Sequence, residues 1–175
     1  MKVAIAADHR GHDAVTPLAE SVRAKGREVI ILGVCDGAPC DYPDRALPVA
    51  LAVARGEADL GILLCGSGIG MCITANKIPG IRAALAHDEF TAQISRAHND
   101  ANILCLSADL LAHKLIERIV ETWLSTPFEG GRHARRVQKI AEIERGGQAH
   151  CCGKGEGDPA SAAAAPTAAG PAAPR

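Results

Sequence analysis

Hydrophobic positions along the chain gather into five short continuous runs, at residues 3–7, 28–32, 60–65, 81–86 and 102–106. Each run is bounded by Gly, Asp, Asn or Pro, which is typical of buried β-strands. Between the runs, apolar residues recur at spacings of three and four, as at Val15, Leu18 and Val22, and this spacing predicts helices. Gly26 then ends the first of these helices.

This alternation predicts the α/β class, with a Rossmann-like three-layer sandwich around a five-stranded, mostly parallel sheet. Two extra C-terminal helices follow the fifth strand, at residues 110–124 and 132–144. The last of them has no strand to cover, so we expect it to reach across to a second subunit.

Composition agrees with such a core. Apolar residues make up 47% of the chain and aromatic residues only 2%, so Ala, Val, Ile and Leu must fill the interior. The net charge of −1 gives no field for nonspecific binding to nucleic acid or anionic membranes. The first apolar run is too short for a signal peptide, and a membrane span needs about 20 apolar residues. We therefore expect a cytoplasmic protein whose seven cysteines stay reduced.

The composition changes at residue 146, where Pro, Gly, Ala and Ser begin to dominate. This predicts one folded domain over 1–145 and a disordered tail over 146–175. The tail contains His150, Cys151 and Cys152, but adjacent cysteines without a second pair of ligands are a weak zinc signal, so no metal site is predicted.

Candidate chemistry lies at the ends of strands, where α/β sheets bind ligands. Three glycines in residues 66–70 allow a tight turn that exposes backbone N–H groups to an anion. Cys65 directly precedes this loop, and neighbouring N–H groups favour a thiolate, so Cys65 is either a catalytic base or nucleophile or a buried structural cysteine. Polar residues also follow the first strand, at 8–12, and precede the fifth, at 96–100.

Two other patterns leave alternatives open. The glycine loop with Asp88 resembles a dinucleotide-binding motif, although its spacing is GxGxG and the helix that follows is very short. Arg132 and Arg136 are four residues apart, so both project from one helix face, where they form either a phosphate clamp or a solvated basic surface.

Taken together, these residues resemble the ribose-5-phosphate isomerase type B family, which also includes allose-6-phosphate and galactose-6-phosphate isomerases. The resemblance runs in order from about residue 2 to 145 through seven stretches: Asp8-His9-x-Gly11, Asp41-Tyr42-Pro43, Cys65 to Gly70, Ala75-Asn76-Lys77, Gly80 to Ala83, His98-Asn99-Asp100-x-Asn102 and Glu129 to His133. Cys65 and Met71 identify the branch of the family that uses a cysteine base.

The resemblance implies reversible isomerisation of D-ribose 5-phosphate and D-ribulose 5-phosphate through an enediolate, without metal or organic cofactor. It implies a homodimer or tetramer in which His98 and Asn99 act opposite the Cys65 of another subunit. Cys65 would be the base and His98 the group that opens the sugar ring. The other implied site residues are Ser67 with Gly66, Gly68, Ile69 and Gly70 for the enediolate, Asp8, Tyr42 and Asn99 for the sugar, and His9, Arg132 and Arg136 for the phosphate.

One position departs from the family pattern. Many relatives carry an Arg shortly after the fifth strand that helps to hold the phosphate, whereas this chain has Asp109. An acid facing the site would repel a phosphate. Isomerisation of a six-carbon phosphosugar such as allose 6-phosphate therefore remains the alternative, with a nucleotide-binding regulatory module as a more distant one.

Overall fold

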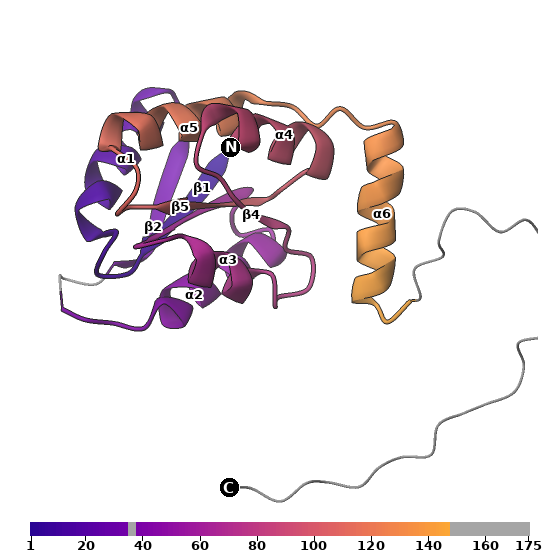
Figure 1. Cartoon of the computed structure of the whole chain (residues 1–175), viewed down its shortest axis with the longest axis horizontal. Coiled ribbons are helices and arrows are strands. Elements are labelled where there is room, and N and C mark those ends of the chain that lie inside the picture. The colour runs from indigo at the N-terminus through magenta and orange to yellow at the C-terminus, as the bar shows by residue number, and fades with distance from the viewer. Residues whose placement is uncertain (35–37, 148–175) are drawn as a thin grey trace, which may run out of the picture.

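The computed structural model describes residues 1–34 and 38–147, and the predicted tail with its His150-Cys151-Cys152 triplet therefore lies almost wholly outside the described residues. Five parallel strands form one sheet in the order β2-β1-β3-β5-β4 (Figure 1). The elements in chain order are β1 (Lys2–Ala7), α1 (His12–Ala24), β2 (Glu28–Val34), α2 (Tyr42–Ala54), β3 (Leu60–Cys65), α3 (Ile69–Ala75), β4 (Ala83–Leu85), α4 (Glu89–Asn99), β5 (Ile103–Ser107), α5 (His113–Ser125) and α6 (Arg132–Glu144). The predicted α/β sandwich is confirmed.

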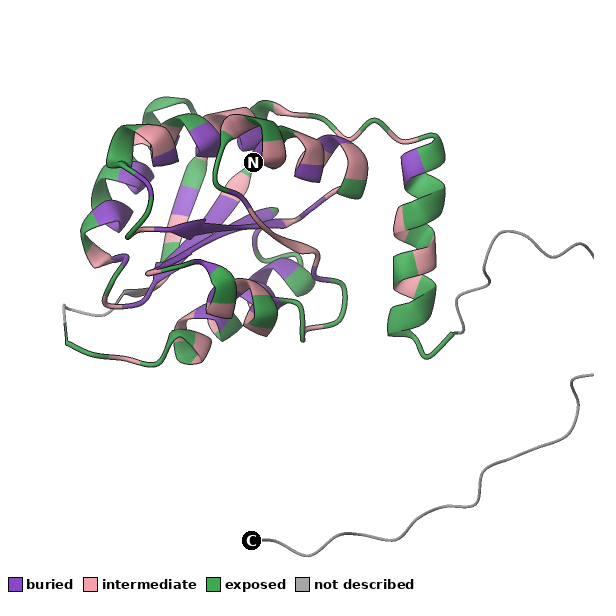
Figure 2. Cartoon of the chain, in the orientation of Figure 1, coloured by how far each residue is buried: buried purple, intermediate pink, exposed green. Residues whose placement is uncertain are grey.

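Helices cover both faces of the sheet, as Figure 1 shows. α1, α4 and α5 lie on one face, and α2 and α3 on the other. The three central strands, β1, β3 and β5, carry the most deeply buried side chains (Figure 2). This distribution explains why those strands are continuous apolar runs in the sequence. Trp123 of α5 is fully buried, and aliphatic side chains supply nearly all the rest of the core.

Three predicted boundaries were wrong by two or three residues. The second strand ends at Val34 instead of residue 32, and at the other two boundaries a side chain takes a backbone hydrogen bond. The fourth strand begins at Ala83 instead of residue 81, since the N–H of Arg82 donates to Oδ1 of Asn102 at 2.8 Å. The helix predicted from residue 110 begins at His113, since the N–H of Leu110 donates to Oγ of Ser107 at 3.1 Å. Helix α6, predicted over 132–144, has those bounds.

Helix α6 stands apart from the sandwich (Figure 1). Of its residues only His133 is buried, whereas Ile140 and Ile143 are 46% and 51% exposed (Figure 2). Its far end is attached to the turn before β4, where the N–H of Gly80 donates to both carboxylate oxygens of Glu144 at 2.9 and 3.0 Å. The described part of the chain contains no helix with the length and apolar character needed to cross a bilayer.

Candidate functional site

The glycine loop after β3 wraps around the sulfur of Cys65. The N–H of Gly68 donates to Sγ of Cys65 at 3.0 Å, and Cys65 is only 4% exposed. Gly68 adopts φ 76°, and a Cβ there would lie 2.5 Å from Cδ1 of Leu85 and 3.0 Å from the backbone of Leu106. Only glycine fits this turn, and the turn is what aims an amide at the sulfur. A negative charge on this sulfur would be stabilised by that amide.

Ser67 and Tyr42 form the outer wall of the same loop. Ser67 is exposed at the tip, where its Oγ accepts from the N–H of Ile69 at 3.3 Å. Tyr42, the first residue of α2, lays its ring against Gly70, since a Cβ on Gly70 would fall 2.6 Å from the ring edge. The loop residues and Tyr42 are thus brought together, and Tyr42 is 43% exposed.

The turn after β1 lies on the strand beside β3. Asp8 is buried, and its Oδ1 accepts from the N–H groups of Arg10 at 2.8 Å and Gly11 at 3.2 Å. The N–H of Asp8 donates to the carbonyl of Leu64 at 3.1 Å, which fixes the turn next to Cys65. His9 accepts from the N–H of Cys40 through Nδ1 at 3.3 Å, so its proton is carried by Nε2.

Asp109 does lie beside the glycine loop, but its charge is paired. Arg10 donates to Asp109 from Nη2 at 2.9 Å and from Nε at 3.1 Å, both to Oδ1. The carboxylate covers Gly66, where a Cβ would lie 2.8 Å from Oδ2. The hydrogen bond and charge of Asp109 raise the pKa of Arg10. The sequence signalled the acid at this position but not the cation that neutralises it.

A second group of predicted residues gathers at the end of α4. His98 stacks on His133, with ring centroids 4.1 Å apart and planes within 5° of parallel. Oε2 of Glu129 lies 3.8 Å from Nε2 of His98 and 3.6 Å from Nε2 of His133. Arg132 donates from Nε to Nε2 of His133 at 3.3 Å. Arg136 lies one helical turn further along α6, exposed like Arg132.

The C-terminal end of α4 is held by a network that the sequence did not reveal. Asp100 caps the helix with φ 46°, and its carboxylate pairs with Arg82 at 3.0 Å and with Arg96 at 2.8 Å. Arg82 also donates to the backbone carbonyl of Asn99 at 3.1 Å. Asn99 is exposed beside this network. The network fixes the backbone from which His98 and Asn99 project.

His98, Glu129 and His133 have the composition of a divalent metal site, with ligand atoms within 4.8 Å of one another. A metal binds the in-plane lone pair of an imidazole, and two parallel rings do not aim these lone pairs at one point. Nε2 of His133 already accepts from Arg132. The arrangement suits a hydrogen-bonded stack better than a metal ion.

Two further thiols lie on the face of the sheet that α2 and α3 cover. The pKa of Cys72 is lowered to about 7, chiefly by a hydrogen bond with Cys105, with further hydrogen bonds from the backbone of Leu85 and from Asn76. Burial, together with the hydrogen bond and charge of Cys72, raises the pKa of Cys105 well above its ordinary value. Neither thiol was singled out from the sequence.

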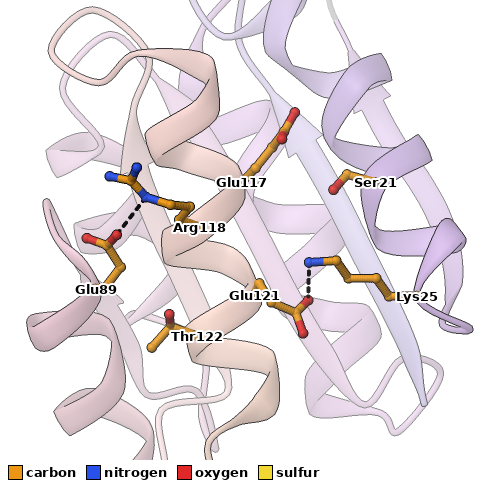
Figure 3. Close-up of a pocket in the computed structure, with 7 residues that line it drawn as sticks. All are labelled: Ser21, Lys25, Glu89, Glu117, Arg118, Glu121 and Thr122. Carbon is orange, nitrogen blue, oxygen red and sulfur yellow. Dashed lines mark hydrogen bonds and ion pairs between the residues drawn. The ribbon is translucent and has the colours of Figure 1, made fainter.

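A separate groove of about 320 Å³ lies between α1, α4 and α5 (Figure 3). Its cations are already paired, since Nε of Arg118 lies 2.8 Å from Glu89 and Nζ of Lys25 lies 3.1 Å from Glu121. The predicted site residues are absent from its lining. We therefore assign the chemistry to the two groups described above and not to this groove.

These two groups lie at opposite edges of the sheet. Cys65 and the turn after β1 are at the carboxyl ends of parallel strands, whereas α4 returns to the amino edge before β5 begins. A strand of six residues spans roughly 20 Å. One chain therefore does not bring Cys65 and His98 together, and Arg132 and Arg136 lie on the side of His98.

The sequence and fold are similar to those of characterised proteins over most of the chain. Residues 3–140 match the sequence profile of the Ribose/Galactose Isomerase family. Ribose-5-phosphate isomerase B of Escherichia coli is 45% identical over 148 residues, which cover 82% of this chain and 97% of that protein.

Solved structures of similar proteins have the same fold as this chain. A Clostridium thermocellum ribose-5-phosphate isomerase B has a TM-score of 0.82 at 48% identity, with 83% of this chain and 99% of that one aligned. A Mycoplasma genitalium ribose-5-phosphate isomerase B with bound ribulose-5-phosphate has a TM-score of 0.77 at 40% identity, with 82% of this chain and 96% of that one aligned.

Proposed function

Because the chain belongs to the Ribose/Galactose Isomerase family, we propose that it interconverts D-ribose 5-phosphate and D-ribulose 5-phosphate. The observation that carries this proposal is the sulfur of Cys65 held 3.0 Å from a glycine-loop amide, in a chain so similar to a protein solved with ribulose-5-phosphate. The nucleotide-binding alternative has no comparable support, and the activity belongs to pentose phosphate metabolism.

The reaction is a proton transfer between neighbouring carbons. Cys65 as thiolate removes the proton from C2 of the open-chain aldose, and the electron pair moves onto the oxygen at C1 to form the enediolate. Loop amides from residues 66–70 and the hydroxyl of Ser67 stabilise that developing charge. Cys65 then returns the proton to C1 while the hydroxyl proton passes from O2 to O1, and the product is the ketose.

The remaining residues bind and open the sugar. His98 transfers a proton at the ring oxygen, because the furanose must open before C2 is reactive. Asp8, Tyr42 and Asn99 orient the hydroxyl groups; both hydrogen bonds on Asp8 end at Oδ1, which leaves Oδ2 for a hydroxyl. His9 donates from Nε2, and Arg132 and Arg136 clamp the phosphate with charge-assisted hydrogen bonds. The mechanism requires no metal or organic cofactor.

The separation of the two groups supports a homodimer with shared active sites. α6 projects from the sandwich with Arg132 and Arg136 exposed, in the position of an arm that reaches a second copy. A groove of about 260 Å³ lies beside it, lined mainly by apolar and amide groups that include Ile81, Ala84 and Ile140. A second subunit would cover these apolar atoms and deliver His98 to the other chain's Cys65. Pairing of such dimers into tetramers is compatible with this arrangement.

The match over residues 3–140 supports a single isomerase domain at 1–145, followed by a tail over 146–175. A cytoplasmic location fits an enzyme of soluble phosphosugars that relies on a free thiol.

The decisive experiment compares Cys65→Ala with the wild type in an assay of ribulose 5-phosphate formation. Loss of the base should lower kcat by about a thousandfold, within the range typical of general-base removal. Cys72→Ala is the matched control, because it removes a neighbouring thiol of lowered pKa and should leave kcat within a few-fold. Near-wild-type turnover by Cys65→Ala would contradict the assignment of the base.

Substrate length is tested in the same assay. Ribose 5-phosphate should be used with a higher kcat/KM than allose 6-phosphate, and the reverse order would favour the six-carbon alternative. Replacing Arg132 and Arg136 together by Ala should weaken the use of the phosphosugar far more than that of unphosphorylated ribose.

A further inference from the structure

His133 is the buried anchor of a helix that is otherwise largely exposed. It is 5% exposed, and the remaining residues of α6 are half-buried or exposed. A buried imidazole on a projecting helix requires an explanation, because burial of a polar ring is costly unless it is packed and hydrogen-bonded. His133 has two such contacts, a ring stack and a hydrogen bond, and both are made with residues to which the proposed function gives a role.

The first partner is His98. The two rings stack in parallel with centroids 4.1 Å apart, so His133 restricts the rotation of the His98 ring about its side-chain bonds. The supporting turn is itself fixed to α4, because the N–H of Glu129 donates to the carbonyl of Ala97 at 3.0 Å. The ring of His133 therefore supports one face of the His98 ring, and part of the His98 side chain is left exposed to meet a substrate.

The second partner is Arg132. Its Nε–H donates to Nε2 of His133, so this nitrogen carries a lone pair and the proton of the neutral ring lies on Nδ1. The hydrogen bond consumes only Nε of the guanidinium, and the terminal nitrogens remain available for a phosphate. An acceptor at this point thus fixes the direction in which Arg132 points.

The charges around His133 favour this neutral form. Burial lowers the pKa of His133, and the positive charges of His98 on α4 and of Arg132 and Arg136 on α6 lower it further, against the opposing effect of Glu129. A protonated His133 would lose the acceptor for Arg132.

We propose that His133 is a positioning residue for the active site of the neighbouring subunit. It aligns the ring-opening His98 through the ring stack and the phosphate-binding Arg132 through the hydrogen bond to Nε2. This inference rests on the proposed function, because it uses the roles assigned there to His98 and Arg132. It adds a residue that has no direct contact with the substrate and that couples sugar opening to phosphate binding.

Two substitutions separate these two contacts. His133→Phe keeps a flat ring under His98 but removes the acceptor, so KM for ribose 5-phosphate should rise about tenfold with kcat nearly unchanged. His133→Gln keeps an acceptor near the place of Nε2 but removes the flat ring, so kcat should fall about tenfold with KM nearly unchanged. Arg135→Ala, an exposed change on the same helix, should leave both constants unchanged. Parallel losses in both variants that follow their melting temperatures would show a merely structural role and overturn the proposal.

An activity-independent measurement distinguishes failure of this inference from failure of the proposed function. Calorimetric titration of the dimeric wild type with inorganic phosphate should give an affinity that His133→Phe and Arg132→Ala both weaken and His133→Gln retains. Equal phosphate affinity in wild type and His133→Phe would overturn the role of His133 toward Arg132, even in an active enzyme. A wild type that binds phosphate in this pattern but does not isomerise ribose 5-phosphate would instead refute the function.

The tautomer gives a test that needs no variant. In protein labelled with ¹⁵N-histidine, His133 should carry its proton on Nδ1 at pH 7 and remain neutral below the pH at which an exposed histidine becomes protonated. Observation of a protonated Nε2 at pH 7 would overturn the proposal, whether or not His133→Phe folds.

Discussion

At the scale of single residues, Arg10 pairs with Asp109 and neutralises the negative charge of this acid beside the glycine loop. The carboxylate covers Gly66, the first residue of the loop that would stabilise the enediolate. An unpaired acid at this position would oppose both a phosphate and an enediolate. The ion pair with Arg10 instead neutralises the charge at this position within the same chain.

This compensation predicts an asymmetry between two substitutions. Arg10→Ala leaves the carboxylate of Asp109 unpaired, and KM for ribose 5-phosphate should rise about tenfold through like-charge repulsion. Adding Asp109→Ala to that variant should restore most of the loss, and Asp109→Ala alone should have little effect or lower KM. Steady-state kinetics of the three variants checks this. If the double variant is as poor as Arg10→Ala alone, Arg10 contacts the substrate directly and charge balance is not its role.

At the scale of elements, a cluster around Glu121 attaches α5 to the segment that leads into β2. Arg27 donates to both carboxylate oxygens of Glu121, at 2.8 and 3.3 Å, and Lys25 lies 3.1 Å away. Burial acts to raise the pKa of Glu121, but hydrogen bonds from Arg27, Ser125 and Lys25 prevail and hold it at about 2, below the ordinary 4.5. The cluster therefore stabilises the fold most where Glu121 is ionised.

The lowered pKa of Glu121 determines how the stability of the protein changes with pH. A depressed carboxyl pKa contributes stability that is present above about pH 4.5 and is lost as the pH falls toward 2. Glu121→Gln should reduce the free energy of unfolding by about 1 kcal/mol at pH 7, given its partial exposure. The difference from wild type should shrink toward zero near pH 2.5. Thermal unfolding across this pH range measures the difference in stability, with Glu20→Gln, an exposed residue of α1, as the control. A difference that does not change with pH would refute an electrostatic origin.

The elements also show which parts of the site are predictable. The strands, the glycine loop and Cys65 can be predicted from the sequence, because hydrophobic runs and glycines act locally. The stack of His133 on His98 could not, since the rings are separated by 35 positions and nothing in either segment indicates that α6 returns to the end of α4. The starts of β4 and α5 were misplaced for the related reason that the side chains of Asn102 and Ser107 accept backbone hydrogen bonds from Arg82 and Leu110.

At the scale of the whole molecule, the parallel sheet separates the candidate site residues into two groups at opposite edges. Cys65, Ser67, Asp8 and His9 lie at the carboxyl edge, and crossover helices must return the chain to the amino edge, where His98 is found. No local adjustment within the described residues 1–34 and 38–147 brings the two edges together without dismantling the sheet. In the proposed homodimer, a second copy approached through α6 would complete the site.

Shared sites predict that two inactive variants restore one another. Cys65→Ala and His98→Ala should each be nearly inactive as homodimers. When the two are unfolded together and refolded in equal amounts, half of the dimers are mixed, and each mixed dimer has one site with both residues intact and one with neither. Activity should then recover to about a quarter of the wild-type value per mass of protein. A site built within one chain gives no recovery, because every site then retains one substitution, so the recovered fraction decides between the two arrangements. The mixture of Cys65→Ala with Cys65→Ser, which leaves every site without its thiol, serves as the control that refolding itself creates no activity.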